Sequence, residues 1–451
     1  MRYFLDPFGC VKNQVDAETM MAFLNRAGWE PVPDAQDADL IIINSCGFIE
    51  SAKQESIDAV LAYRKRYPDK RILLAGCLAQ RYPAELAESL TEADAFFGNA
   101  DLSRISEAAG AALEGSRRAL IPEPEPATLE PAALEPERAA IAGGRPLLSL
   151  PGSACVKIAE GCNNRCSFCA IPHIRGPLRS RSIQDVLEEC RRLLNRGIRE
   201  LCFIGQDLGA YGRDFPPELE LSLAKLLRAV SALEGNFWAR LLYIHPDSFP
   251  RSILELCRED PRLLPYFDLP FQHGSTETLR AMNRRGDAAA YLALIEDIRS
   301  ALPGAVIRST FLTGFPGETE ADFQALLDFQ AQARLDWLGV FTYSREEGTP
   351  AYTMKRRVPR KLAAERKGIL EERQIPITEE RLDRFIGREL DVLVEERFHG
   401  AEGLYLGRLF CQAPEIDGAA VIRSESSLSL GEFARCKVFA RAGFDLEVKP
   451  L

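Results

Sequence analysis

Length, composition and charge set the first limits on this chain. It has 451 residues, 46% hydrophobic and 27% charged, which is typical of a globular protein with more than one domain. No apolar run approaches the ~18 residues that a membrane span requires, and the first residues carry no export signal, so we expect a cytoplasmic protein. The net charge of -10 argues against an extended surface for nucleic acid and suits a basic partner better.

The first predicted domain spans residues 1–115. Short apolar strands alternate there with amphipathic helices, as in Ala38–Ile43 followed by Ala52–Tyr63. Such alternation predicts an α/β domain with a largely parallel sheet.

Three cysteines in this domain, Cys10, Cys46 and Cys77, each follow an apolar strand segment. Parallel strands end at one edge of a sheet, so the three thiols are expected to converge there. Free cysteine is often buried, and three core thiols are the simpler alternative. The neighbouring glycine and serine residues favour tight loops around a metal cluster, and we expect a [4Fe-4S] cluster with one open iron.

A different composition follows at residues 116–150. The segment is rich in Pro, Glu, Ala and Gly and has little hydrophobic periodicity, so it can bury little apolar surface. We therefore interpret it as an acidic linker.

The central domain, predicted over residues 151–373, again alternates strands and helices. Its candidate strands are Cys155–Ile158, Leu201–Gly205, Arg240–Ile244, Tyr266–Leu269, Val306–Phe311 and Leu338–Tyr343. Six such units predict an open or closed α/β barrel. A charged helix over Arg360–Arg373 then leads into short β-rich segments, and residues 377–449 are expected to form a small antiparallel β-barrel.

A compact cysteine motif follows the first strand of the central domain. Cys162, Cys166 and Cys169 lie at spacings of four and three residues on one short loop. Three thiolates hold three irons of a cubane and leave the fourth iron open for the amino and carboxylate groups of S-adenosylmethionine. A zinc knuckle is the alternative, but zinc sites normally close with a fourth ligand, for which His173 is the nearest candidate.

This motif, with Phe168 in its aromatic position, resembles that of the radical S-adenosylmethionine superfamily. The resemblance implies a partial (βα)6 barrel with the cofactor at the carboxyl ends of its strands. It also implies that polar residues at those ends contact the cofactor, and the expected cofactor-binding residues are Phe168, Gln206, Asp207, Gln272 and Arg308. The stretch Gly314–Glu318 is another candidate, although its sequence is first of all that of a turn into a helix.

A closer resemblance covers essentially the whole chain. The sequences around Cys10, Cys46, Cys77 and the Cys162–Pro172 loop resemble those of the methylthiotransferase family, and the C-terminal barrel resembles its TRAM domain. Membership implies two [4Fe-4S] clusters, held by Cys10, Cys46 and Cys77 and by Cys162, Cys166 and Cys169, with no catalytic residue assigned beyond them. It also implies that one S-adenosylmethionine supplies a methyl group to a sulfur and a second is cleaved to a radical. A sulfur donor and a low-potential electron donor such as flavodoxin or ferredoxin are the implied partners.

Two branches of this family differ in substrate. One modifies the β-carbon of an aspartate in small-subunit ribosomal protein uS12, and the other modifies isopentenylated adenosine in tRNA. The segments Cys10–Asn13, Gly47–Ile49, Ala170–Gly176 and Ala413–Gly418 resemble the ribosomal-protein branch. Over residues 378–451 Asp and Glu outnumber Lys and Arg by 14 to 10, which suits a basic protein better than RNA. We therefore expect uS12 as substrate, with the tRNA branch as the alternative.

The other six cysteines stand singly in apolar segments. Core packing is expected for all of them, namely Cys155, Cys190, Cys202, Cys257, Cys411 and Cys436.

Overall fold

The computed structural model describes residues 1–123, 144–398 and 400–451, so most of the segment expected as a linker lies outside the described residues. The described chain forms two compact units. One comprises Met1–Leu148, Lys157–Glu189 and Ser344–Tyr352, and the other comprises Ser149–Val156, Cys190–Tyr343 and Thr353–Leu451. None of the described helices has the length and apolar character of a membrane span.

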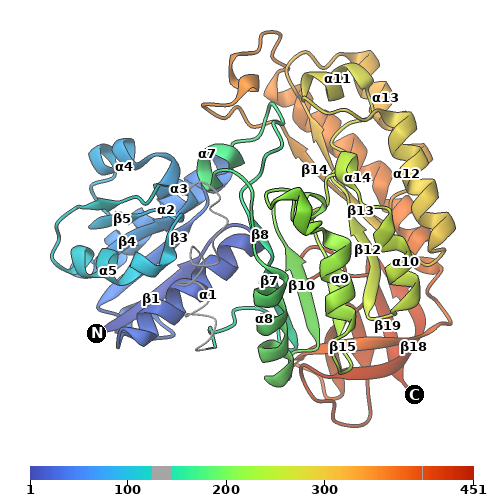
Figure 1. Ribbon diagram of the computed structural model, residues 1–451, viewed down its shortest axis with the longest axis horizontal. Coiled ribbons are helices and arrows are strands. Elements are labelled where there is room, and N and C mark those ends of the chain that lie inside the picture. Colours follow the sequence, from blue (N-terminus) through green and yellow to red (C-terminus); the bar gives the residue numbers. More distant parts are fainter. Residues whose placement is uncertain (124–143, 399) are drawn as a thin grey trace. The chain divides into compact units, whose positions relative to one another are not determined.

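The first unit is built on a six-stranded sheet in the order β2-β1-β3-β4-β5-β6. Figure 1 labels β1, β3, β4 and β5 of this sheet. Its strands are β1 (Arg2–Pro7), β2 (Glu30–Pro31), β3 (Leu40–Ser45), β4 (Arg71–Gly76), β5 (Ala95–Phe97) and β6 (Ala119–Leu120). Every neighbouring pair is parallel, which confirms the α/β domain expected from the alternating pattern.

Helices cover both faces of this sheet because β3 and β4 are apolar on both sides. Alternate residues of a strand point to opposite faces, so Leu40 and Ile42 pack with α1 and α5, whereas Ile41 and Ile43 pack with α2, α3 and α4. The helices are α1 (Val11–Arg26), α2 (Glu50–Arg66), α3 (Cys77–Arg81), α4 (Pro83–Ser89) and α5 (Ile105–Leu113).

The loop with the compact cysteine motif also belongs to the first unit. It is bounded by two short antiparallel strands, β8 (Ala159–Glu160) and β9 (Arg179–Ser180). Between them the chain forms α7 (Ile171–Arg175), directly after the last cysteine of the motif.

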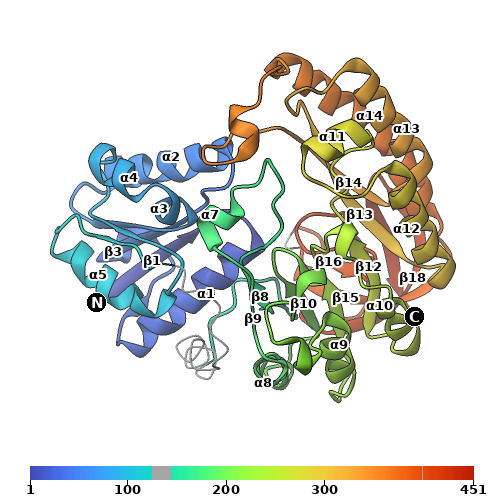
Figure 2. The same ribbon diagram turned by 45° about the horizontal axis from the view of Figure 1, so that its top comes forward.

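The second unit contains a six-stranded sheet in the order β14-β13-β12-β11-β10-β7. Figure 2 labels β10, β12, β13 and β14 of this sheet. Its strands are β7 (Ser153–Lys157), β10 (Glu200–Ile204), β11 (Trp238–Leu241), β12 (Leu263–Asp268), β13 (Val306–Thr313) and β14 (Trp337–Thr342). The pairs from β10 to β14 are parallel. All six predicted strands are thus present, and the sheet forms an open barrel.

Helices alternate with these strands as predicted. They are α8 (Ile183–Asn195), α9 (Leu223–Ser231), α10 (Ser252–Glu259), α11 (Thr276–Ala281), α12 (Ala288–Ala301), α13 (Glu320–Ala333) and α14 (Arg360–Asp383). The last helix is longer than expected and continues through Pro376. Buried polar contacts extend it: Gln374 donates to the carbonyl of Leu335 at 2.8 Å, and Thr378 donates to the carbonyl of Asp336 at 2.9 Å.

The C-terminal strands close into a five-stranded barrel, which confirms the expected small β-barrel. The strands are β15 (Glu389–Arg397), β16 (Leu404–Leu409), β17 (Ala420–Arg423), β18 (Phe433–Ala442) and β19 (Asp445–Pro450). Pairing is antiparallel except between β17 and β19, which run in parallel and complete the closure.

A buried charge network joins this small barrel to the open barrel of the same unit. Glu200 on β10 accepts from Arg240 Nε at 2.7 Å and pairs with Arg408 of β16, which also contacts Glu395 at 2.6 Å. Burial alone would raise the pKa of Glu200, but the guanidinium groups of Arg408 and Arg240 lower it to about 2. The ionised carboxylate therefore holds both arginines in place.

Replacing Glu200 by Gln should destabilise the protein strongly. The side chain is 0% exposed, and its loss leaves two buried guanidinium groups without their shared carboxylate, a change that typically costs about 3–5 kcal/mol. Chemical denaturation followed by circular dichroism measures the effect. As a control, Glu380→Gln removes the partner of Arg334 at a position 68% exposed and should cost less than about 1 kcal/mol. Equal losses in the two variants would contradict the structural role of Glu200.

Candidate functional site

Three cysteines of the first unit stand at the carboxyl ends of three adjacent parallel strands. Cys10 follows β1 and precedes α1, Cys46 directly follows β3, and Cys77 follows β4 as the first residue of α3. Because β1, β3 and β4 are neighbours in the sheet, the three thiols meet at one edge. Cys10 is exposed, Cys46 is partly buried and Cys77 is buried.

The loops that carry these cysteines are in close contact, and two glycines make this possible. A Cβ atom on Gly9, whose φ is +93°, would lie 2.9 Å from Cys46 Cβ and 3.3 Å from Cys46 Sγ. A Cβ atom on Gly47 would lie 2.6 Å from the carbonyl oxygen of Cys77. Side chains at either position would separate the thiols.

Polar side chains hold the same loops together. Asn13 Nδ2 donates to the carbonyls of Phe8 at 3.1 Å and Ser45 at 2.9 Å, so it connects the ends of β1 and β3. Ser56 Oγ accepts from the Cys46 backbone N–H at 3.1 Å. The sequence motif that contains Asn13 does not reveal its role in holding the loops, and Ser56 has no local signal, since its partner lies ten residues away.

Burial controls the protonation of Cys77. It is the main cause that raises the pKa of this thiol to about 12, a value to which Cys10 and Cys46 contribute in the same direction and Arg175 in the opposite one. A buried thiol of this kind is deprotonated by coordination to a metal. The residues at this edge therefore fit an iron-sulfur cluster held by three cysteines.

The second set, Cys162, Cys166 and Cys169, lies on one partly buried loop of the same unit. The Cys169 N–H donates to the Cys166 carbonyl at 3.1 Å, and the Cys162 N–H donates to the carbonyl of Gly176 at 3.1 Å. The loop is closed by the segment that follows it, since Asn163 Oδ1 accepts from the Leu178 N–H at 3.0 Å.

The thiols of neither cysteine set are as close together as the ligands of a single metal ion. Within the described residues, no group of three or more His, Cys, Asp or Glu side chains could hold one metal ion. A cubane needs no such arrangement, because each of its cysteines binds a different iron.

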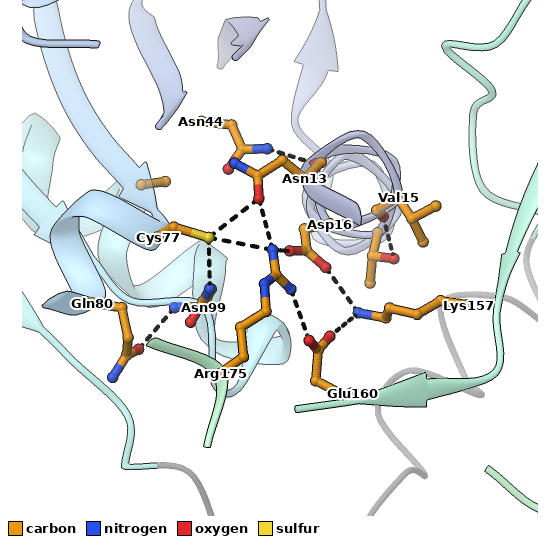
Figure 3. A network of polar contacts seen from close by, with 12 residues as sticks. Asn13, Val15, Asp16, Asn44, Cys77, Gln80, Asn99, Lys157, Glu160 and Arg175 are labelled. Atoms are coloured by element: carbon orange, nitrogen blue, oxygen red, sulfur yellow. Dashed lines mark hydrogen bonds and ion pairs between the residues drawn. The ribbon is translucent and has the colours of Figure 1, made fainter. Parts of the chain in front are cut away.

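A buried polar network surrounds Cys77 (Figure 3). Arg175, at the end of α7, places Nη2 2.8 Å from Asp16 Oδ2, 2.7 Å from Asn13 Oδ1 and 3.3 Å from Cys77 Sγ. Asn99 Nδ2 lies 3.2 Å from the same sulfur. Sequence reasoning missed the roles of Arg175, Asp16 and Asn99, since none is close in sequence to Cys77.

The network continues through Lys157 and Glu160. Glu160 Oε1 accepts from Arg175 Nη1 at 2.9 Å, and Lys157 Nζ contacts Asp16 at 2.8 Å and Glu160 at 2.7 Å. Burial would raise the pKa of Glu160, but Arg175 and Lys157 together lower it well below the usual range. Two cations and two carboxylates thus neutralise one another beside the cysteines.

In the second unit, three of the expected cofactor-binding residues lie beyond the carboxyl ends of strands, namely Gln206, Asp207 and Gln272. Asp207 lies past the carboxyl end of β10, where it accepts from the backbone N–H groups of Gly209 and His245 at 3.0 Å. Gln206 precedes it, and Gln272 lies past the end of β12 with a φ of +70°. Phe168 is half-buried in the cysteine loop of the first unit.

Arg308 stands apart from the other expected contacts of the second unit. It is the third residue of β13, near the amino end of the strand, and pairs with Asp268 at 3.4 Å and with Asp417 of the C-terminal region at 3.5 Å. Its role as a cofactor contact stays a prediction.

The Gly314–Glu318 stretch forms a turn that leads into α13. Glu318 Oε2 accepts from the N–H groups of Gly314 at 2.7 Å and Phe315 at 3.2 Å, and Oε1 pairs with Arg366 at 2.7 Å. The carboxylate therefore closes its own turn, as the structural interpretation of this stretch implied.

Comparison with protein-family models matches three parts of the chain. Residues 2–98 match the family described as "Uncharacterized protein family UPF0004", residues 156–329 match the radical SAM superfamily, and residues 386–450 match the TRAM domain. These regions contain most of the first sheet, most of the open barrel and the closed barrel.

Curated relatives match over nearly the full length. The ribosomal protein uS12 methylthiotransferase RimO of Treponema denticola is 44% identical, and the match covers 98% of this chain and 99% of that protein. The protein of the same name from Moorella thermoacetica is 42% identical over 93% of this chain and 92% of its own length.

Solved structures share the fold at low sequence identity. The radical S-adenosylmethionine methyltransferase TsrM of Kitasatospora setae is 16% identical, with a TM-score of 0.55 over 78% of this chain and 74% of its own. At this identity the likeness concerns the fold alone. The near full-length relatives decide the family: the chain belongs to the RimO family of radical S-adenosylmethionine methylthiotransferases, enzymes that use S-adenosylmethionine and two [4Fe-4S] clusters.

Proposed function

We propose that this protein adds a methylthio group to the β-carbon of an aspartate in ribosomal protein uS12, in the cytoplasm. The relatives that match the whole chain carry the name of that activity. The convergence of Cys10, Cys46 and Cys77 at one sheet edge, in the same unit as the second cysteine loop, is the observation that supports it most directly. The acidic C-terminal region suits a basic ribosomal protein.

In this proposal each set of cysteines holds one cluster. Cys10, Cys46 and Cys77 hold the auxiliary cluster, and Cys162, Cys166 and Cys169 hold the radical cluster. When bound, the two clusters supply the electron that cleaves S-adenosylmethionine and a site for the transferred sulfur. Three cysteines in each set leave one iron open for an exogenous ligand. A sulfur donor and a low-potential electron donor such as flavodoxin or ferredoxin complete the set of proposed partners.

Residues at the strand ends are proposed to bind S-adenosylmethionine. Phe168, Gln206, Asp207 and Gln272 follow strands or cluster ligands, which is where ligands bind in parallel α/β folds. Arg308 belongs to the same proposed set, but it must leave Asp268 and Asp417 to reach a ligand at the carboxyl edge.

The substrate can be tested by anaerobic turnover of the reconstituted enzyme with S-adenosylmethionine, sulfide and dithionite. The uS12 protein and isopentenylated tRNA are offered in parallel, and the products are read by mass spectrometry. We expect a methylthio group on an aspartate of uS12 and an unmodified tRNA. A methylthio group on adenosine alone would assign the chain to the tRNA branch.

The division of labour between the clusters predicts different losses in two variants. Cys10→Ala should abolish methylthio transfer and leave deoxyadenosine formation measurable, because the radical cysteines are intact. Cys162→Ala should abolish both, since S-adenosylmethionine cleavage needs the radical cluster. Liquid chromatography of deoxyadenosine together with mass spectrometry of uS12 checks both outcomes. Equal loss of deoxyadenosine in the two variants would refute the assignment.

The close approach of the loops predicts that Gly47→Ala loses the auxiliary cluster. Its new methyl group would meet the Cys77 carbonyl and push the two loops apart, so iron per chain should fall by roughly half. Gly110→Ala is the matched control, because a Cβ atom there meets nothing within 4 Å, and its iron content should be unchanged. Full iron content in Gly47→Ala would show that the close approach is unnecessary.

A further inference from the structure

Two side-chain donors converge on the buried sulfur of Cys77. Arg175 Nη2 lies 3.3 Å from Sγ and Asn99 Nδ2 lies 3.2 Å from it, and they come from α7 and from the loop after β5 (Figure 3). The same sulfur is 3.2 Å from Asn13 Oδ1, to which the free thiol donates. Once metal binding removes the thiol proton, Arg175 and Asn99 are the donors directed at the thiolate.

The Arg175 guanidinium is fixed by its other partners. Asp16, Glu160 and Asn13 each accept from it at 2.9 Å or less, and the side chain is only 3% exposed. A guanidinium held in this way presents its N–H groups in a set direction, and the two Nη2 hydrogens are shared among Asp16, Asn13 and Cys77 Sγ. The contact with Cys77 is therefore preorganised and does not depend on a mobile surface arginine.

The charge balance explains why this arginine can stay beside the cluster site. Lys157 and Arg175 are matched by Asp16 and Glu160, so the buried cations do not stand uncompensated. A cluster with three thiolates gains negative charge on reduction, and hydrogen bonds and positive charge at its sulfur ligands favour that reduced form. The hydrogen bonds from Arg175 and Asn99 to Cys77 therefore favour the reduced form of the cluster.

We propose that Arg175 is a positioning residue that, together with Asn99, donates hydrogen bonds to the Cys77 thiolate and raises the reduction potential of the auxiliary cluster. The inference rests on the proposed ligand role of Cys77. A raised potential makes the auxiliary cluster a weaker reductant, so that it holds sulfur without itself delivering the electron that cleaves S-adenosylmethionine.

The test uses the full chain with Cys162, Cys166 and Cys169 replaced by Ala, so that the auxiliary cluster is observed by itself. After anaerobic reconstitution, its midpoint potential is measured by a redox titration followed by electron paramagnetic resonance. Arg175→Gln should shift the potential to a more negative value, and Arg175→Lys should shift it less because the charge is kept. Asn99→Ala should also shift it negatively, by less than Arg175→Gln, because a neutral donor is lost.

A matched control separates the sulfur contact from the general loss of an ion-paired arginine. Arg64→Gln removes the 2.5 Å ion pair with Asp94 at the amino-terminal edge of the same sheet, away from the cysteines, and should leave the potential unchanged. A shift in Arg64→Gln as large as that in Arg175→Gln would overturn the inference.

The remaining outcomes distinguish failure of the proposed ligand role of Cys77 from failure of the inference about the reduction potential. If the parent variant with Arg175 intact binds no cluster, the ligand assignment fails and the inference fails with it. If the parent binds a cluster whose potential is the same in Arg175→Gln and Asn99→Ala, only the inference is refuted. If Arg175→Gln loses its cluster, the potentials of Arg175→Lys and Asn99→Ala test the inference instead. Unchanged potentials in both variants would refute it.

Discussion

The parallel pairing of β1, β3 and β4 is the constraint on which the convergence of Cys10, Cys46 and Cys77 depends. Parallel strands bring their carboxyl ends to one edge, so a cysteine placed directly after each strand reaches the same place. The strands alone do not bring the loops that carry these cysteines into contact. Gly9 and Gly47 allow the loops to approach within van der Waals distance, and Asn13 fixes them there through the carbonyls of Phe8 and Ser45.

Buried charges serve two different purposes in the two units. In the second unit, Glu200 binds Arg240 and Arg408 and thereby joins two elements, which is a structural role. In the first unit, Asp16 and Glu160 neutralise Arg175 but leave its guanidinium in contact with a sulfur atom. Both networks pair every charge, as burial demands, yet the network of the first unit also contacts Cys77, a residue proposed as a cluster ligand.

The sequence predicted those features that depend on local patterns. Apolar runs located all six strands of the open barrel, and the position of a cysteine after each of three strands was enough to predict their convergence. Long-range partners were not predictable in this way. The continuation of α14 past Pro376 depends on the carbonyls of Leu335 and Asp336, and the position of Arg308 beside Asp417 depends on the C-terminal barrel.

The most consequential long-range contact is that of Arg175, because of the segment on which it lies. α7 begins two residues after Cys169, so one short stretch carries Cys162, Cys166 and Cys169 as well as a donor to Cys77. The Cys162 N–H donates to the carbonyl of Gly176, the residue that follows Arg175. This hydrogen bond connects the two ends of the stretch. The segment that carries Cys162, Cys166 and Cys169 therefore also supplies a side chain that contacts Cys77. The two cysteine sets are linked by this one buried polar contact.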